Sequence, residues 1–178
     1  MTRWMAPILS FTAQEIWEAL PGERDKFVFT SVWYDGLQAS SQGKFSNEDW
    51  LTILNVRDEV NRVLEAARKE EVIGATLQAN VNIYAGEELS AKLAALGDEL
   101  RFVLLTSGVT VETVTAQPED TQATEIDGLY IKVAATTAEK CERCWHYCDD
   151  VGADPAHPEI CGRCVSNVDG DGEQRQFA

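Results

Sequence analysis

The arrangement of four cysteines near the C-terminus constrains this 178-residue chain more than any other feature. Cys141 and Cys144 form one Cys-x-x-Cys pair, Cys161 and Cys164 form a second, and sixteen residues separate the two pairs. This spacing is typical of a structural tetrathiolate zinc site, in which each pair places two thiolates about 2.3 Å from one ion. Because four sulfurs leave no open position for a substrate, the pattern predicts a site that maintains structure and does not catalyse a reaction.

The spacing leaves the metal open between zinc and iron, since a rubredoxin-like iron site uses the same four thiolates. Zinc is favoured because a structural site needs no redox chemistry. We expect His146 and His157 not to bind the metal, because the thiolates complete the tetrahedron, and we expect Cys148 to be a free thiol. A segment this short buries too little apolar surface to fold alone, so metal removal should unfold it.

The charge of the chain is strongly acidic, with a formal net charge of −15 and a pI near 4.4. Residues 136–178 carry four basic and nine acidic side chains. This balance opposes nonspecific attraction to nucleic acid, so any contact with RNA must be local, and a solvated acidic surface explains most of the charge. No apolar run is long enough to span a membrane, and the thiols suit a reducing compartment. We therefore expect a cytoplasmic protein without membrane association.

The N-terminal segment predicts a short helix at residues 13–20. Thr12 is a suitable N-cap with Glu15 three residues later, and Phe11 can pack on Ile16 as a hydrophobic staple. Residues 27–34 are rich in β-branched and aromatic side chains and are expected to be extended, and the polar residues 38–44 are expected to form a loop.

A long amphipathic helix is predicted next. Ser46 and Asp49 form a capping box, and apolar residues then recur at steps of three and four to about residue 71, ahead of Gly74. The cations of this helix are expected to pair with neighbouring acids and not with nucleic acid. These cations are Arg57, Arg62, Arg68 and Lys69.

After Gly74 the pattern changes to a small α+β unit. Alternation at residues 81–85 predicts a strand, leucines at residues 89–100 predict a helix, and apolar runs predict strands at 102–105, 109–114 and 129–134. The polar residues 117–128 are expected to form a loop. The fold class is therefore α+β, with a partial helical bundle at 1–75, a small α+β domain at 76–137 and a four-cysteine zinc finger at 138–178.

The sequence carries no recognisable catalytic motif. It lacks a Gly-rich phosphate loop, a His-Glu-x-x-His helix and a G-x-S-x-G turn, and two histidines leave little for acid–base chemistry. We expect that this chain is not an enzyme by itself.

Over essentially its whole length the chain resembles the C-terminal end of the bacterial isoleucyl-tRNA synthetases. The motifs that carry the resemblance are RWMAPILSFTAQEIW at 3–17, VRDEVNRVLEAAR at 56–68, LGDEL at 96–100, CERCWHY at 141–147, CGRCVSN at 161–167 and GDGEQRQFA at 170–178. The cysteine-rich tail is the most specific of these. A related finger ends some DNA glycosylases, so the cysteine pairs alone would be ambiguous.

The resemblance implies a class I ligase that charges isoleucine tRNA with the use of ATP. The signatures that such enzymes use for ATP, and the editing pocket, are absent, so the chain is expected to be a fragment that starts within the helical anticodon-binding domain and is inactive alone. Expected partners are isoleucine tRNA and the rest of the synthetase chain. The apolar residues that upstream helices would cover are then expected to be exposed, repacked or covered by self-association. They are Trp4, Ile8, Phe11, Ile16 and Trp17.

The resemblance also implies that the zinc end helps to seat the anticodon stem. Arg143, Trp145 and Arg163 are the candidate RNA contacts, because cations and an exposed aromatic beside the cysteines can meet phosphates and unstacked bases. Trp145 can instead be a lid packed on the metal module, and the two arginines can neutralise the thiolates. A repair enzyme with the same finger is disfavoured by the acidic charge. A free-standing zinc-ribbon adaptor that binds protein partners is the main alternative function.

Overall fold

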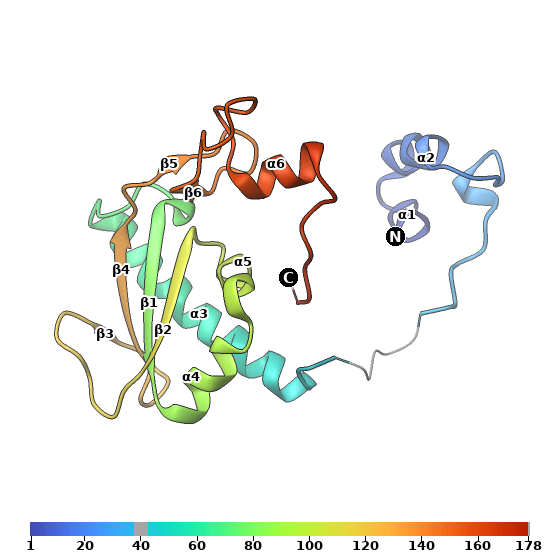
Figure 1. Cartoon of the computed structure of the whole chain (residues 1–178). Coiled ribbons are helices and arrows are strands. Elements are labelled where there is room, and N and C mark those ends of the chain that lie inside the picture. The colour runs from blue at the N-terminus through green and yellow to red at the C-terminus, as the bar shows by residue number, and fades with distance from the viewer. Residues whose placement is uncertain (38–42, 178) are drawn as a thin grey trace. The chain divides into compact units, whose positions relative to one another are not determined.

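The computed structural model describes residues 1–37 and 43–177. The chain forms two compact units, Met1–Lys44 and Phe45–Ala178, each with its own apolar core (Figure 1). Most of the loop predicted at 38–44 lies outside the described residues. Within the part of the chain that the structure describes, no helix is both long enough and apolar enough to cross a membrane.

The first unit contains the helices α1 (Thr2–Met5) and α2 (Ser10–Ala19) and the 3-10 turn η1 (Val28–Thr30). Its small core is formed by Ala6, Ala13, Trp17 and Val28. The indole N–H of Trp17 donates to the carbonyl of Asp25 at 2.8 Å, which fixes the returning chain on α2.

Two sequence predictions for this unit are wrong. Helix α2 begins at Ser10 and not after Thr12, because the amide of Ala13 already donates to the carbonyl of Leu9 at 2.8 Å and places Thr12 inside the helix. The stretch 27–34 contains the turn η1 in place of a strand. The amide of Val28 donates to the side chain of Gln14 at 3.0 Å, so this segment binds to α2.

Several apolar side chains of the first unit face solvent. Ile8 and Phe11 are 84% and 88% exposed, and Trp4 and Ile16 are also exposed, whereas Trp17 is buried. Exposure, repacking or self-association was expected of these five side chains, and four are exposed while Trp17 packs into the small core. Self-association of this surface stays a prediction.

The second unit begins with the long helix α3 (Asn47–Lys69), and its predicted start is confirmed. The Ser46 side chain accepts from the Asp49 amide at 3.1 Å, and the Asp49 carboxylate accepts from the Ser46 amide at 2.9 Å. Two of the predicted intrahelical ion pairs form, Arg62 with Glu59 at 2.5 Å and Arg68 with Glu65 at 3.3 Å. The helix ends two residues earlier than predicted, and residue 71 adopts a left-handed conformation just beyond it.

Four strands form one sheet in the order β2-β1-β4-β3. They are β1 (Ala79–Ala85), β2 (Gly108–Thr113), β3 (Gln122–Ala123) and β4 (Tyr130–Ala135). Strand β1 is parallel to β2 and antiparallel to β4. Alternate β1 residues, among them Val81 and Ile83, are fully buried, while Asn80 on the other face is exposed.

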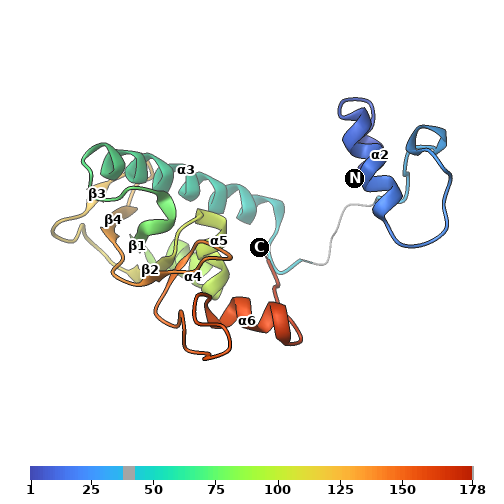
Figure 2. The ribbon, with the colours of Figure 1, turned by 90° about the horizontal axis from the view of Figure 1, so that it is seen from above.

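Helices cover the buried face of this sheet. Helix α3 runs along it, and α4 (Glu87–Ala94), the 3-10 turn η3 (Gly97–Glu99) and α5 (Leu100–Leu104) connect β1 to the parallel strand β2 (Figure 2). The predicted strand at 102–105 is wrong, because Leu100 and Leu104 are both buried four residues apart, which a helix allows. The α+β fold class is correct.

The compact units do not follow the predicted division of the chain. Helix α3 shares one core with the sheet, in which Ile53 and Val60 are buried together with Val81, so the second unit starts at Phe45 and not near residue 75. The ranges 1–75, 76–137 and 138–178 stay a prediction about functional regions.

Candidate metal centre

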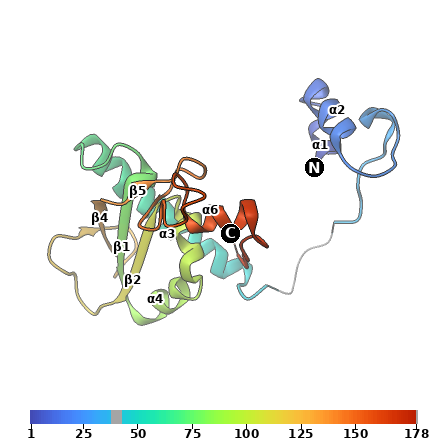
Figure 3. The same cartoon turned by 45° about the horizontal axis from the view of Figure 1, so that its top comes forward.

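Three short elements at one end of the sheet position the four cysteines: β5 (Glu139–Lys140), β6 (Tyr147–Cys148) and α6 (Gly162–Asp169) (Figures 1 and 3). The strands β5 and β6 pair in antiparallel fashion, and the turn between them carries the first cysteine pair. That turn is closed by two backbone bonds of 2.9 Å, from Cys141 to the carbonyl of His146 and from Trp145 to the carbonyl of Cys141. Cys161 is the N-cap of α6 and Cys164 lies in its first turn.

The four sulfur atoms form a compact cluster in which all lie within 4.8 Å of one another. The Sγ atoms of Cys141 and Cys164 are 3.7 Å apart, and those of Cys144 and Cys161 are 3.8 Å apart. These distances exclude disulfides, whose S–S bond is about 2.05 Å. A tetrahedron with metal–sulfur bonds of about 2.3 Å has sulfur–sulfur edges of about 3.8 Å. The cluster therefore has the dimensions of a tetrathiolate zinc site.

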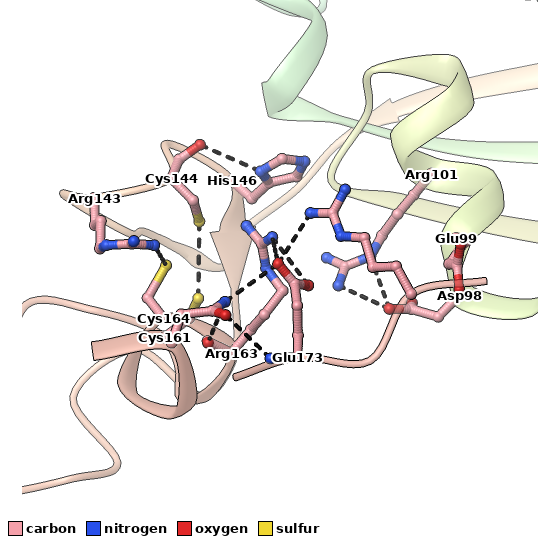
Figure 4. Close-up of polar contacts among 12 residues, drawn as sticks. Asp98, Glu99, Arg101, Arg143, Cys144, His146, Cys161, Arg163, Cys164 and Glu173 are labelled. Atoms are coloured by element: carbon pink, nitrogen blue, oxygen red, sulfur yellow. Dashed lines mark hydrogen bonds and ion pairs between the residues drawn. The ribbon is translucent and has the colours of Figure 1, made fainter. Parts of the chain in front are cut away.

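Hydrogen-bond donors point at two of the sulfurs. The amide of Cys161 donates to the Sγ of Cys141 at 3.4 Å, and the guanidinium of Arg143 donates to the Sγ of Cys164 at 3.6 Å (Figure 4). Such donors stabilise the thiolate form over the thiol. Three of the four cysteines are buried, so water contributes little to the charge of the sulfurs.

The local environment lowers the pKa of one cysteine thiol and raises the pKa of two others. Burial raises the pKa of Cys141, but backbone N–H groups of Cys144, Cys161 and Arg143 outweigh it and bring the pKa to about 6. Burial is the main cause that raises the pKa of Cys164 to about 12. Burial also raises the pKa of Cys161. Thiols this close resist simultaneous ionisation in the absence of a cation. A bound divalent ion would displace the remaining protons.

Neither the two histidines nor the fifth cysteine belongs to the four-sulfur cluster. His146 places its Nδ1 atom 3.3 Å from the carbonyl of Cys144, and His157 hydrogen-bonds Asp169, so neither histidine belongs to the four-sulfur cluster. Cys148 lies beside Cys161, and burial raises the pKa of its thiol to about 12. That Cys148 is a free thiol stays a prediction.

Trp145 and Arg143 lie on the surface of the same turn. The Trp145 side chain is 61% exposed, its backbone is left-handed with φ 66°, and the Lys140 ammonium lies 5.4 Å from its ring centroid. Arg143 is exposed as well. The indole is therefore not a lid over the cysteines, and the Lys140 ammonium lies beside it.

Arg163 contacts the Cys144 thiol, as the alternative to an RNA contact predicted, and it has two further partners. Its guanidinium is 3.1 Å from the Glu173 carboxylate and 5.0 Å from the Phe102 ring centroid, and its side chain is 18% exposed. Burial opposes its charge, but contact with the Cys144 thiol and with Glu173 raises its pKa further. Arg163 thus holds the cysteine module, residues 138–170, together from inside. Sequence reasoning missed both Phe102 and Glu173 as its partners.

Comparison with known families matches the N-terminal part of the chain and the segment that carries the cysteines. The family described as "Zinc finger found in FPG and IleRS" matches residues 138–167, and the family "Anticodon-binding domain of tRNA ligase" matches residues 1–83. An isoleucine–tRNA ligase of Pseudoalteromonas translucida is 78% identical over all 178 residues. The chain belongs to the isoleucine–tRNA ligase family.

Other isoleucine–tRNA ligases match over the same full length of the chain. Those of Colwellia psychrerythraea and Aliivibrio fischeri are 56% and 59% identical and also cover 100% of it. The chain spans about a fifth of the length of these relatives, 19% of the Pseudoalteromonas ligase and 20% of the Colwellia ligase. Together with the two family matches, this shows that the chain corresponds to a C-terminal fragment of an isoleucine–tRNA ligase.

Proposed function

We propose that this chain is the tRNA-binding C-terminal region of an isoleucine–tRNA ligase and that it positions the anticodon side of isoleucine tRNA. The match to an anticodon-binding domain and the names of the relatives support this proposal. Holding one end of a long tRNA fixes where its acceptor end arrives, which assists ATP-dependent aminoacylation elsewhere in the parent enzyme. The catalytic step and its ATP would belong to that enzyme, and we expect the fragment alone to be inactive.

One zinc ion is proposed to be held by Cys141, Cys144, Cys161 and Cys164. The sulfur–sulfur distances of 3.7 and 3.8 Å carry this part of the proposal, because they match the edges of a zinc tetrathiolate. The ion would supply structure only, since four thiolates saturate it. The apolar side chains packed against the cysteines are few, Val151 and Ile160, so the ion would provide most of the cohesion of this segment.

The surface beside the metal is proposed as the RNA contact. Trp145 can stack on an unpaired base, and Lys140 and Arg143 can meet the adjoining phosphates, which is how proteins hold single-stranded RNA loops. Arg163 is proposed to support this surface and not to touch RNA, because its guanidinium is bound to Glu173. The acidic charge of the remaining chain favours a contact confined to this turn.

Binding to tRNA tests this function directly. The fragment is titrated with isoleucine-accepting tRNA and an unrelated tRNA at two salt concentrations, before and after zinc removal. We expect weak binding that prefers the isoleucine tRNA, decreases with salt and is lost without zinc. Equal affinity for both tRNAs, or binding unchanged by zinc removal, would contradict the proposal.

The adaptor alternative receives no support from these findings. The relatives match the whole chain, including residues that an isolated zinc ribbon would not need. A reading frame that extends several hundred codons upstream of Met1 would remove this alternative. A cytoplasmic location and self-association of the apolar first unit remain proposals, checked by cell fractionation and by sedimentation.

A further inference from the structure

The ring of Phe102 on helix α5 contacts side chains from the cysteine module and from the C-terminal segment. The His146 ring approaches it edge-on at 5.5 Å between centroids. The Arg163 guanidinium lies 5.0 Å from the ring centroid and that of Arg175 lies 4.1 Å from it. Phe102 is half-buried and does not belong to the described apolar core, although its neighbours Leu100 and Leu104 do. Its contacts are therefore directed at the module and not at the sheet.

Ser107 makes a second connection between the module and the sheet. Its hydroxyl accepts a hydrogen bond of 2.7 Å from the amide of Tyr147, which lies on β6 of the module. The same hydroxyl donates to the carbonyl of Leu77, just before β1. Because Ser107 is buried and both of its bonds reach backbone atoms, it fixes the separation of β6 from the start of the sheet.

Glu99 makes a third connection, to the end of the chain. Its carboxylate accepts from the amides of Gln176 at 2.7 Å and Phe177 at 2.6 Å. The Phe177 ring then packs at 5.1 Å and 75° against Phe45, immediately before α3. The segment that follows α6 therefore returns along the second unit and is held at its far end (Figure 1).

The cations around Phe102 pair with carboxylates of the protein itself. Arg163 and Arg175 both contact Glu173 at 3.1 Å, and Arg101 contacts Asp98 at 2.8 Å (Figure 4). Each of these three cations has a carboxylate partner within the protein, with Glu173 shared by Arg163 and Arg175. The cluster connects helix α5 to the cysteine module and the C-terminal segment.

We propose that Phe102, Ser107 and Glu99 are positioning residues that set the orientation of the four-cysteine module relative to the sheet. This inference rests on the proposed function, because the orientation matters through the RNA-facing turn of Trp145 and Arg143. The three residues touch neither metal nor RNA. They act by fixing the direction in which that turn points, and a small error in direction at one end of a tRNA becomes a large displacement at the other.

Orientation can be measured without RNA. Residual dipolar couplings of the zinc-loaded 178-residue chain report whether residues 138–170 and the sheet share one alignment. We expect one shared alignment in the unmodified chain and separate alignments in Phe102→Ala and in Glu99→Gln. Phe29→Ala, at an exposed aromatic of the first unit, and Glu119→Gln, at an exposed loop carboxylate, are the matched controls and should leave the shared alignment intact.

Metal content and tRNA affinity complete the test. Each variant should keep one zinc per chain, and the full-length ligase carrying Phe102→Ala should bind isoleucine tRNA about tenfold more weakly. Phe102→Tyr, which keeps the ring, should restore affinity, and Phe102→Leu, which keeps apolar volume, should not. A shared alignment in all variants would contradict the proposal that these residues set the orientation of the module relative to the sheet. Separate alignments with unchanged tRNA affinity would support the positioning role of these residues. They would contradict the proposal that the module faces RNA.

Discussion

The Sγ atoms of Cys144 and Cys161 belong to different cysteine pairs and lie 3.8 Å apart. The other short sulfur–sulfur distance, 3.7 Å between Cys141 and Cys164, also crosses from one pair to the other. A metal ion at this position would therefore join two segments separated by sixteen residues. Few apolar side chains besides the cysteines connect these segments, so the ion should be the main bond between them.

Zinc removal is expected to unfold the module while the sheet stays folded. Treatment with a chelator should collapse the amide NMR dispersion of residues 138–167, because the remaining apolar contacts cannot offset the chain entropy. Signals of β1 and α3 should persist, since their core does not include the cysteines. Unchanged dispersion of residues 138–167 in protein shown to be metal-free would count against a structural ion.

Zinc affinity is expected to fall as the pH decreases. The metal binds thiolates, so protons compete with it for the ligands. The thiol of Cys164, with a pKa of about 12, is protonated at any ordinary pH in the absence of metal, so the ion must displace that proton. Cys141, with a pKa near 6, takes up a proton as the pH falls through that value, which weakens binding further. Competition with a zinc-binding dye between pH 5 and 8 measures this trend. An affinity independent of pH would exclude thiolate ligation.

Cysteine variants should separate ligands from the neighbouring thiol. Cys164→Ser is expected to lose zinc, because it removes one corner of the tetrahedron, whereas Cys148→Ser is expected to retain one zinc per chain. Both cysteines lie near Cys161, so the second variant is a close control for the first. Metal analysis after dialysis decides the matter, and loss of zinc from Cys148→Ser would show that the fifth thiol binds the ion.

Local sequence signals predicted well wherever the decisive contacts are close along the chain. The capping box of Ser46 and Asp49 and the alternation of β1 both appear as predicted. The start of α2 was mispredicted because the preceding backbone, and not the Thr12 side chain, supplies the bond that begins the helix. Residues 102–105 were mispredicted as a strand because an apolar run this short fits a buried helix equally well.

The sequence predicted that the four cysteines cluster, but it did not predict the residues that surround them. The cysteine spacing places four sulfurs together whatever the rest of the chain does. Phe102 and Glu99 could not be found in this way, because their partners lie in the finger and in the C-terminal segment, and Glu99 is bonded to a residue 78 positions away. Arg163 beside a cysteine suggested RNA contact, yet Glu173 holds it internally.

Trp145 combines a strained backbone with an exposed ring, and substitutions should separate the two. Glycine adopts the left-handed conformation freely, so Trp145→Gly should stabilise the turn by about 1 kcal/mol relative to Trp145→Ala. Both should weaken isoleucine tRNA binding by about 1–3 kcal/mol, because both remove a stacking surface. Urea unfolding and tRNA titration measure the two effects. Full tRNA affinity in either variant would show that the indole does not contact RNA.

Glu59 fastens the loop before β4 to helix α3 from a buried position. Its carboxylate accepts from Arg62 at 2.5 Å and from the amide of Glu125 at 3.0 Å. Glu59→Gln should lower the free energy of unfolding at pH 7 by about 1 kcal/mol, because both bonds end on one oxygen, which the glutamine carbonyl oxygen can replace, but the bond from Arg62 loses its charge assistance. Urea unfolding followed by far-UV circular dichroism measures the change.

The same carboxylate gives this effect a defined pH dependence. The bond from Arg62 foremost lowers the pKa of Glu59, against an opposing effect of burial, so its contribution is present above the unfolded pKa of about 4.3 and is lost as the pH falls through the folded value. The difference between the two proteins should therefore shrink on acidification toward pH 3. Glu65→Gln is the matched control, because Glu65 pairs with Arg68 three residues along the same helix but is exposed, and it should change stability by less than about 0.5 kcal/mol. An equal effect of the two substitutions, or a Glu59→Gln effect that does not depend on pH, would mean that the buried carboxylate does not hold the loop.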